Sequence, residues 1–136
     1  MSHKCKNLIL MCMDFRYPEV VIEWAKSNGM SRDYDLISLA GAQKAVLDED
    51  TRETVFKQLK ISTDLHGINR VVIVAHQDCG AYGGSAAFKS LEEEKEKYAD
   101  DMRKAAEIIR EQHPQMKFLF VILLDDDGKI TFEQIP

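Results

Sequence analysis

The sequence predicts a single α/β domain over residues 1–136, with a mostly parallel sheet flanked by helices. Short apolar runs alternate along the chain with segments that have the apolar spacing of helices. The runs are continuously apolar, which is typical of strands buried on both faces. No repeat or linker divides the chain. With the strands numbered in chain order, we expect the order 2-1-3-4 and a last strand antiparallel to its neighbour.

The first half of the chain contains two expected strands and two expected helices. The apolar runs Asn7–Cys12 and Tyr34–Leu39 predict the strands. Pro18 opens the first helix, since its fixed backbone suits the first helical position. A longer helix begins near Asp50 and ends at Gly67.

The second half adds three expected strands and a long charged helical region. Arg70–Ala75 is rich in β-branched residues and predicts a buried strand. One or two amphipathic helices precede Pro114, and the charges at 92–97 are expected on a solvated helix face. The apolar stripe consists of Leu91, Tyr98, Met102, Ala105 and Ile109. Lys117–Leu124 and Lys129–Ile135 predict the last two strands, joined by a turn at Asp125–Gly128.

The composition excludes several classes of function. The formal net charge is −5, and Lys and Arg are interspersed with acidic residues, so we expect no nucleic-acid partner. No apolar stretch approaches the length of a membrane span, and we expect a cytoplasmic protein. The three cysteines do not have the spacing of a disulfide framework. In a reducing compartment, metal binding or catalysis is their expected use.

Two short segments carry the chemistry, and each follows an expected strand. Cys12-Met-Asp14-Phe-Arg16 follows the first strand, and His76-Gln-Asp-Cys79-Gly80 follows the third. In an open parallel sheet, ligands bind beyond the carboxyl ends of strands, where the winding direction reverses. With the order 2-1-3-4, that point lies between the first and third strands. We therefore expect the two segments to meet there.

The two segments together offer the ligand set of a zinc site. Cys12, His76 and Cys79 supply two thiolates and one imidazole, which predicts one Zn²⁺ per chain with a vacant or carboxylate-held fourth position. Asp14 either accepts a hydrogen bond from zinc-bound water or takes the fourth position itself. Arg16 lies two residues further on and can hold that carboxylate off the metal.

These residues resemble the motifs of the β-class carbonic anhydrases. That family carries Cys-x-Asp-x-Arg after its first strand and His-x-x-Cys-Gly after its third. Ala40-Gly41 is similar to the family's turn after the second strand. Ile68–Val74 and the hairpin Gly128-Lys129-Ile130 extend the resemblance along nearly the whole chain.

The resemblance implies a zinc lyase that interconverts carbon dioxide and bicarbonate. Zinc-bound hydroxide would attack the carbon of CO₂, with Cys12, His76 and Cys79 holding the metal and Asp14 and Arg16 acting as a gating dyad. It also implies a homodimer, which the need to cover the apolar last strand favours as well.

The chain departs from the family's pattern in three places. Phe15 stands between the Asp and the Arg, where the family usually has Ser. Ser38-Leu39-Ala40-Gly41 replaces the usual Arg-Asn-Ala-Gly, so a polar pair near the site is lost. The chain also starts close to its first strand, and we expect no counterpart of the N-terminal helices that commonly embrace a partner subunit.

Two alternatives use the same residues. The first is a zinc hydrolase of carbonyl sulfide or carbon disulfide, which a narrow apolar pocket gated by Phe15 would suit. The second is a non-catalytic zinc-binding module, in which Asp14 permanently closes the fourth position. A thiol-redox role is less favoured because the chain has no Cys-x-x-Cys motif.

Overall fold

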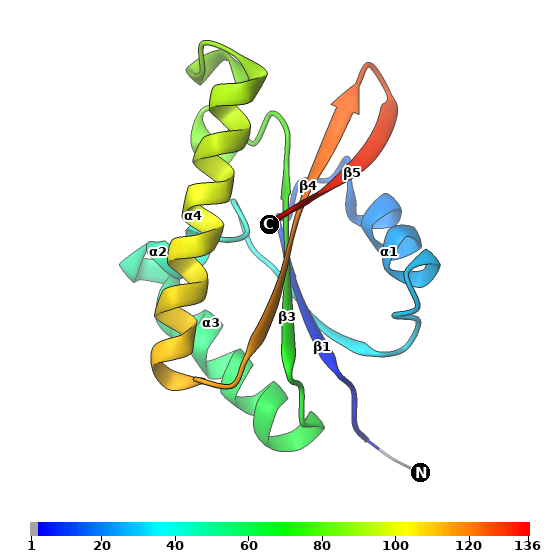
Figure 1. Cartoon of the computed structure of the whole chain (residues 1–136), viewed down its shortest axis with the longest axis vertical. Coiled ribbons are helices and arrows are strands. Elements are labelled where there is room, and N and C mark those ends of the chain that lie inside the picture. Colours follow the sequence, from blue (N-terminus) through cyan, green and yellow to red (C-terminus); the bar gives the residue numbers. More distant parts are fainter. Residues whose placement is uncertain (1–2) are drawn as a thin grey trace.

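Five strands form one sheet in a computed structural model of the chain, which describes residues 3–136 (Figure 1). The strands are β1 (Asn7–Met11), β2 (Tyr34–Ser38), β3 (Arg70–His76), β4 (Lys117–Asp126) and β5 (Lys129–Ile135). Their order is β2-β1-β3-β4-β5. The first four are parallel and β5 is antiparallel to β4. The predicted fold class and strand order are confirmed.

Helices cover both faces of the sheet. Helix α1 (Pro18–Ser27) lies on one face, and α2 (Lys44–Leu47), α3 (Glu49–Ile61) and α4 (Leu91–Gln112) lie on the other (Figure 1). Alternate side chains of a strand point to opposite faces of the sheet. Because helices cover both faces, the side chains of the central strands are buried on both sides. In β1, Leu8 and Leu10 pack with the core beneath α2–α4, whereas Ile9 and Met11 pack beneath α1. The continuous apolar runs follow from this double burial.

Two local features differ from the prediction. The helix expected to run from Asp50 to Gly67 begins one residue earlier and ends at Ile61, and a π-helical turn, Ser62–His66, follows it. Gly67, in the left-handed region at φ +70°, ends that turn. Helix α2 was not predicted, because four residues are too few to show a helical period. The charged region before Pro114 forms one helix, α4.

No helix within residues 3–136 combines the length and the apolar character that crossing a membrane requires.

Candidate metal centre

The two chemistry-bearing segments meet at the carboxyl ends of neighbouring strands. Cys12 directly follows β1, His76 is the last residue of β3, and Cys79 follows three residues later. One ligand atom from each of these residues lies within 4.8 Å of the others. All three side chains are buried, at 8% exposure or less. The pairing of β1 with β3 therefore brings Cys12 beside His76 and Cys79, which come from a segment much further along the chain.

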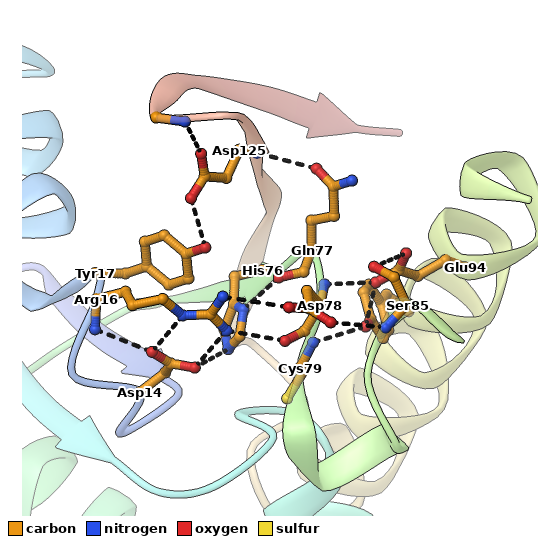
Figure 2. A network of polar contacts seen from close by, with 12 residues as sticks. Asp14, Arg16, Tyr17, His76, Gln77, Asp78, Cys79, Ser85, Glu94 and Asp125 are labelled. Carbon is orange, nitrogen blue, oxygen red and sulfur yellow. Dashed lines mark hydrogen bonds and ion pairs between the residues drawn. The ribbon is translucent and has the colours of Figure 1, made fainter. Parts of the chain in front are cut away.

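The His76 ring is oriented so that one nitrogen is left free. Its Nδ1 lies 2.7 Å from the carbonyl oxygen of Gln77, which can only accept, so Nδ1 carries the proton in the neutral ring (Figure 2). The Nε2 atom is buried and has no hydrogen-bond partner among residues 3–136. The Tyr17 ring packs against the imidazole, with 4.8 Å between centroids. A buried ring nitrogen with a free lone pair, beside two thiols, fits a metal ligand.

The neighbouring Cys12 and Cys79 thiols shift each other's pKa in opposite directions. The neighbouring Cys79 thiol stabilises the Cys12 thiolate and lowers the pKa of Cys12 to about 4. The same contact raises the pKa of Cys79, because its proton is held against the Cys12 thiolate. The backbone N–H of Gly41 also donates to Cys12 Sγ at 3.4 Å. Since metal binding needs both thiolates, it would release the proton of the Cys79 thiol.

Gly41 makes this contact possible through its backbone. Its φ of +82° lies in the left-handed region, and a Cβ at this position would lie 2.7 Å from Lys44 Cβ. Only glycine fits both constraints, so this turn places its N–H against Cys12 without strain.

Asp14 and Arg16 form a tight pair at the edge of the cluster (Figure 2). Arg16 Nε and Nη2 donate to the two carboxylate oxygens at 3.0 and 2.8 Å, and the Arg16 backbone N–H donates at 2.9 Å. These bonds lower the pKa of Asp14 to about 2. Asp14 Oδ2 lies 3.8 Å from His76 Nε2 but is outside the group of mutually close ligand atoms.

Arg16 has a second anionic partner, Asp78, to which the sequence analysis assigned no role. Its Nη1 lies 3.3 Å from Asp78 Oδ2, and its Nη2 donates to the Asp78 carbonyl at 3.0 Å. Asp78 Oδ1 in turn accepts from the Ser85 backbone N–H at 2.8 Å. The loop between His76 and Cys79 is therefore tied to the loop that carries Asp14.

A buried carboxylate behind the site was missed from the sequence. Glu94 of α4 is 1% exposed, so the expectation that residues 92–97 form a solvated face is wrong at this position. Its oxygens accept from the Asp78 backbone N–H (2.6 Å), the Tyr98 hydroxyl (2.7 Å) and the Ser85 hydroxyl (2.9 Å). The Tyr98 hydroxyl also accepts from the Cys79 N–H at 3.4 Å. One signal in the sequence could have indicated this burial. Glu94 lies four residues before Tyr98 and therefore on the same face of the helix as that apolar residue.

A small cavity adjoins the three candidate ligand residues, and Gln43 and Tyr82 help to line it. Gln43 is fully buried and donates through Nε2 to the Tyr82 hydroxyl at 3.1 Å. Tyr82 donates to Asp101 at 2.8 Å. Phe15, expected as a possible gate, does not line the cavity, because its side chain is 89% exposed. Sequence reasoning did not find Gln43, because no motif marks it.

Comparison with known proteins gives two relatives that match nearly the whole chain. An uncharacterized protein of Rickettsia bellii is 33% identical over 98% of this chain and 83% of its own. An uncharacterized protein of Rickettsia conorii is 30% identical over 98% of this chain and 73% of its own. Neither description names an activity.

Solved β-carbonic anhydrases share the fold. CafD of Aspergillus fumigatus superposes with a TM-score of 0.60 at 16% identity, over 97% of this chain and 90% of the other. One of two tetrameric β-carbonic anhydrases of Sordaria macrospora gives 0.59 at 13% identity, over 100% and 84%. Residues 2–134 match the family described as "Putative carbonic anhydrase". The chain belongs to that family and shares the fold of the β-class enzymes.

Proposed function

We propose that this protein is a zinc lyase that interconverts carbon dioxide and bicarbonate, with one zinc ion per chain on Cys12, His76 and Cys79. The observation that carries the proposal is the buried Nε2 of His76, which has no hydrogen-bond partner among the described residues and lies beside two buried thiols at the switch point of the sheet. Family membership and the shared fold support the choice of reaction.

The sulfur and nitrogen donors of Cys12, Cys79 and His76 fit a zinc ion that acts as a Lewis acid. Two thiolates and a neutral imidazole are common zinc ligands, and their charge formally cancels that of the ion. When bound, zinc acts as a Lewis acid that makes water a nucleophile near neutral pH. The Gln77 carbonyl orients the His76 ring, and the Gly41 N–H helps to fix Cys12.

Asp14 is proposed to orient the attacking water. With a pKa of about 2, the carboxylate is ionised at neutral pH and accepts hydrogen bonds, but it is too weak a base to hold the proton that the reaction releases. The overall reaction, CO₂ + H₂O to HCO₃⁻ + H⁺, therefore sends that proton to solvent or buffer. Arg16 is proposed to keep Asp14 in this orienting position.

The closed, non-catalytic alternative requires Asp14 to leave Arg16 and bind the metal. The two side-chain hydrogen bonds of Arg16 to the carboxylate oppose that movement and favour an accessible fourth position. Hydrolysis of carbonyl sulfide or carbon disulfide would use the same residues. The exposed position of Phe15 removes the apolar gate that had favoured these substrates.

We also propose a homodimer in the cytoplasm. The tetrameric relatives from Sordaria macrospora support self-association, and the exposed apolar side chains of Met13 and Phe15 beside the site would gain from burial. Three free cysteines are consistent with a reducing compartment. No nucleic-acid partner is proposed.

The test of the proposed function is stopped-flow CO₂ hydration by zinc-loaded protein between pH 6.5 and 9. We expect zinc-dependent hydration that is lost in Cys12→Ser and His76→Ala, together with the zinc ion bound at this centre. The matched control is Cys5→Ser, which removes a thiol outside the centre and should retain hydration. Stoichiometric zinc at the centre without hydration at any pH would overturn the reaction but leave the metal site standing.

A further inference from the structure

A second group of metal-ligating side chains lies at the opposite end of the sheet, near the start of β1 (Figure 1). Cys5 precedes β1, Asp35 is the second residue of β2, and His66 ends the π-helical turn after α3. One ligand atom from each lies within 4.8 Å of the others. Across the described chain, residues 3–136, this trio and the metal centre are the two groups that meet this distance.

The main chain fixes the three positions relative to one another. The backbone N–H of Cys5 donates to the carbonyl of His66 at 3.0 Å, which joins the segment before β1 to the π-helical turn. The parallel pairing of Asn7 with Tyr34 places the start of β2 beside the start of β1. Three separate segments of the chain therefore converge on this point.

Two of the donors are already in contact. His66 Nδ1 lies 2.6 Å from Asp35 Oδ2, and the Ser62 hydroxyl donates to the same oxygen at 2.6 Å. Cys5 is a free, half-buried thiol whose Sγ makes a long hydrogen bond, 3.6 Å, to the Asn7 carbonyl. All three residues are partly exposed.

The trio opens on a cavity of about 230 Å³. Its lining includes His3, Arg32 and Tyr34 as well as the three ligand candidates. The cavity gives a metal ion a path from solvent and room for a solvent ligand. Arg32 and Lys4 also line the cavity and oppose cation binding, and burial raises the pKa of the Cys5 thiol, so zinc must displace its proton. The Cys5 thiolate formed in this way and the Asp35 carboxylate together offset the charge of a divalent ion.

We propose that Cys5, Asp35 and His66 bind a second zinc ion, with the fourth position facing the cavity and filled by solvent. Thiolate, imidazole and carboxylate are all zinc ligands. In a tetrahedral site with bonds of roughly 2.0–2.3 Å, ligand atoms lie about 3.3–3.8 Å apart. Asp35 and His66, now 2.6 Å apart in a hydrogen bond, must therefore separate by about 1 Å through side-chain rotation, and the Cys5 thiol, within 4.8 Å of both, completes the site. Ser62 keeps its bond to Asp35 and orients that ligand. The site joins the starts of β1 and β2 to the turn before β3 and takes no part in CO₂ chemistry.

Zinc titration against a chromophoric chelator tests this site in the full chain at pH 7.5. We expect two equivalents of zinc in the wild type. Each of the single variants Cys5→Ser and His66→Gln should bind one equivalent, because both lose the same site. The matched control is His113→Gln at the end of α4, which should keep two. The Cys12→Ser/His76→Ala variant should keep the second equivalent, so this test does not depend on the lyase activity.

A spectroscopic arm identifies the ligand directly. With Cys12 and Cys79 both replaced by Ser, Cys5 is the one remaining thiol. Cobalt(II) should then give a thiolate charge-transfer band that is lost in the triple variant with Cys5→Ser. One equivalent of zinc in the wild type that Cys5→Ser and His66→Gln leave in place would overturn the site. Two equivalents retained in both variants would also overturn it, because the second ion would then lie elsewhere on the surface.

Discussion

Arg16 binds two carboxylates at once, and its contacts fix the ionisation and the orientation of Asp14. Its guanidinium contacts both oxygens of Asp14 and also Asp78 on the neighbouring loop. A bidentate, charge-assisted pair is among the stronger polar contacts in proteins. Asp14 is therefore kept ionised and turned toward Arg16, and the loops after β1 and β3 are joined.

Replacing Arg16 with Gln should raise the pKa of Asp14 from about 2 toward about 4, its ordinary value, because the charged partner is lost. In the wild type the folded-state pKa lies below the unfolded one, so Asp14 stabilises the fold above about pH 4, and this contribution is lost as the pH falls toward 2. Carboxyl ¹³C NMR of the zinc-free protein measures the pKa. Arg103→Gln, which removes a contact with Asp100 on α4, is the control. An Asp14 pKa that stays near 2 in the Arg16 variant would contradict this assignment.

Gly41→Ala should destabilise the protein more than Gly128→Ala does. Both residues have positive φ, so both substitutions cost about 1 kcal/mol of backbone strain. Only at Gly41 would the new Cβ clash, at 2.7 Å from Lys44 Cβ, whereas nothing lies within 4 Å at Gly128. Urea unfolding measures the difference, which we expect to exceed about 1 kcal/mol. Equal losses would show that the turn at Gly41 can relax.

At the scale of elements, α4 both covers the sheet and supports the site. Its apolar stripe packs on the core from Tyr98 to Ile109, but Leu91, predicted to belong to the stripe, is exposed in the first turn of the helix. Glu94 reaches from the same helix to the loop that carries Asp78 and Ser85. Helical periodicity predicted the stripe. It could not predict the burial of Glu94, because the donors that make that burial tolerable come from a loop whose course depends on the tertiary fold.

Glu94→Ala should lower the free energy of unfolding by about 3 kcal/mol, because it leaves buried donors without their acceptor. Glu96→Ala, on the exposed side of the same helix, should change it by less than about 0.5 kcal/mol. Chemical denaturation of the two variants measures both values. Similar effects at the two positions would mean that Glu94 does not organise the loop.

The short elements mark the limit of what the sequence predicts at this scale. The strands were predicted because their apolar runs are continuous. Helix α4 was predicted because its apolar period persists over many residues. Helix α2 and the π-helical turn at Ser62–His66 span four and five residues, too few to define a period. Their positions depend on contacts such as Ser62 with Asp35 and Gln43 with Tyr82, which join distant segments.

For the whole molecule, the strand order places the candidate centre. The prediction of the order and of the meeting point needed only right-handed parallel crossovers and motifs at strand ends, so Cys12, His76 and Cys79 could be grouped in advance. The side chains that surround these three residues could not be predicted in the same way. The positions of Glu94, Gln43 and Phe15 depend on packing that no local pattern records.

Zinc should stabilise the whole fold, because the ligands come from the loops after two neighbouring strands. In the Cys5→Ser background, zinc at about 100 times its Kd should add about 2.7 kcal/mol to the free energy of unfolding. Thermal unfolding with and without a chelator measures the effect. A further Cys79→Ser substitution should abolish it, and Mg²⁺ in place of zinc should not reproduce it. Stabilisation that survives the loss of Cys79 would place the responsible ion elsewhere.

X-ray absorption at the zinc edge tests the central claim most directly. The sample is Cys5→Ser protein loaded with one equivalent of zinc, in which Cys12 and Cys79 are the two remaining thiols. The account predicts two sulfur ligands at about 2.3 Å and two nitrogen or oxygen ligands at about 2.0–2.1 Å. A zinc ion with one sulfur ligand or none would contradict it.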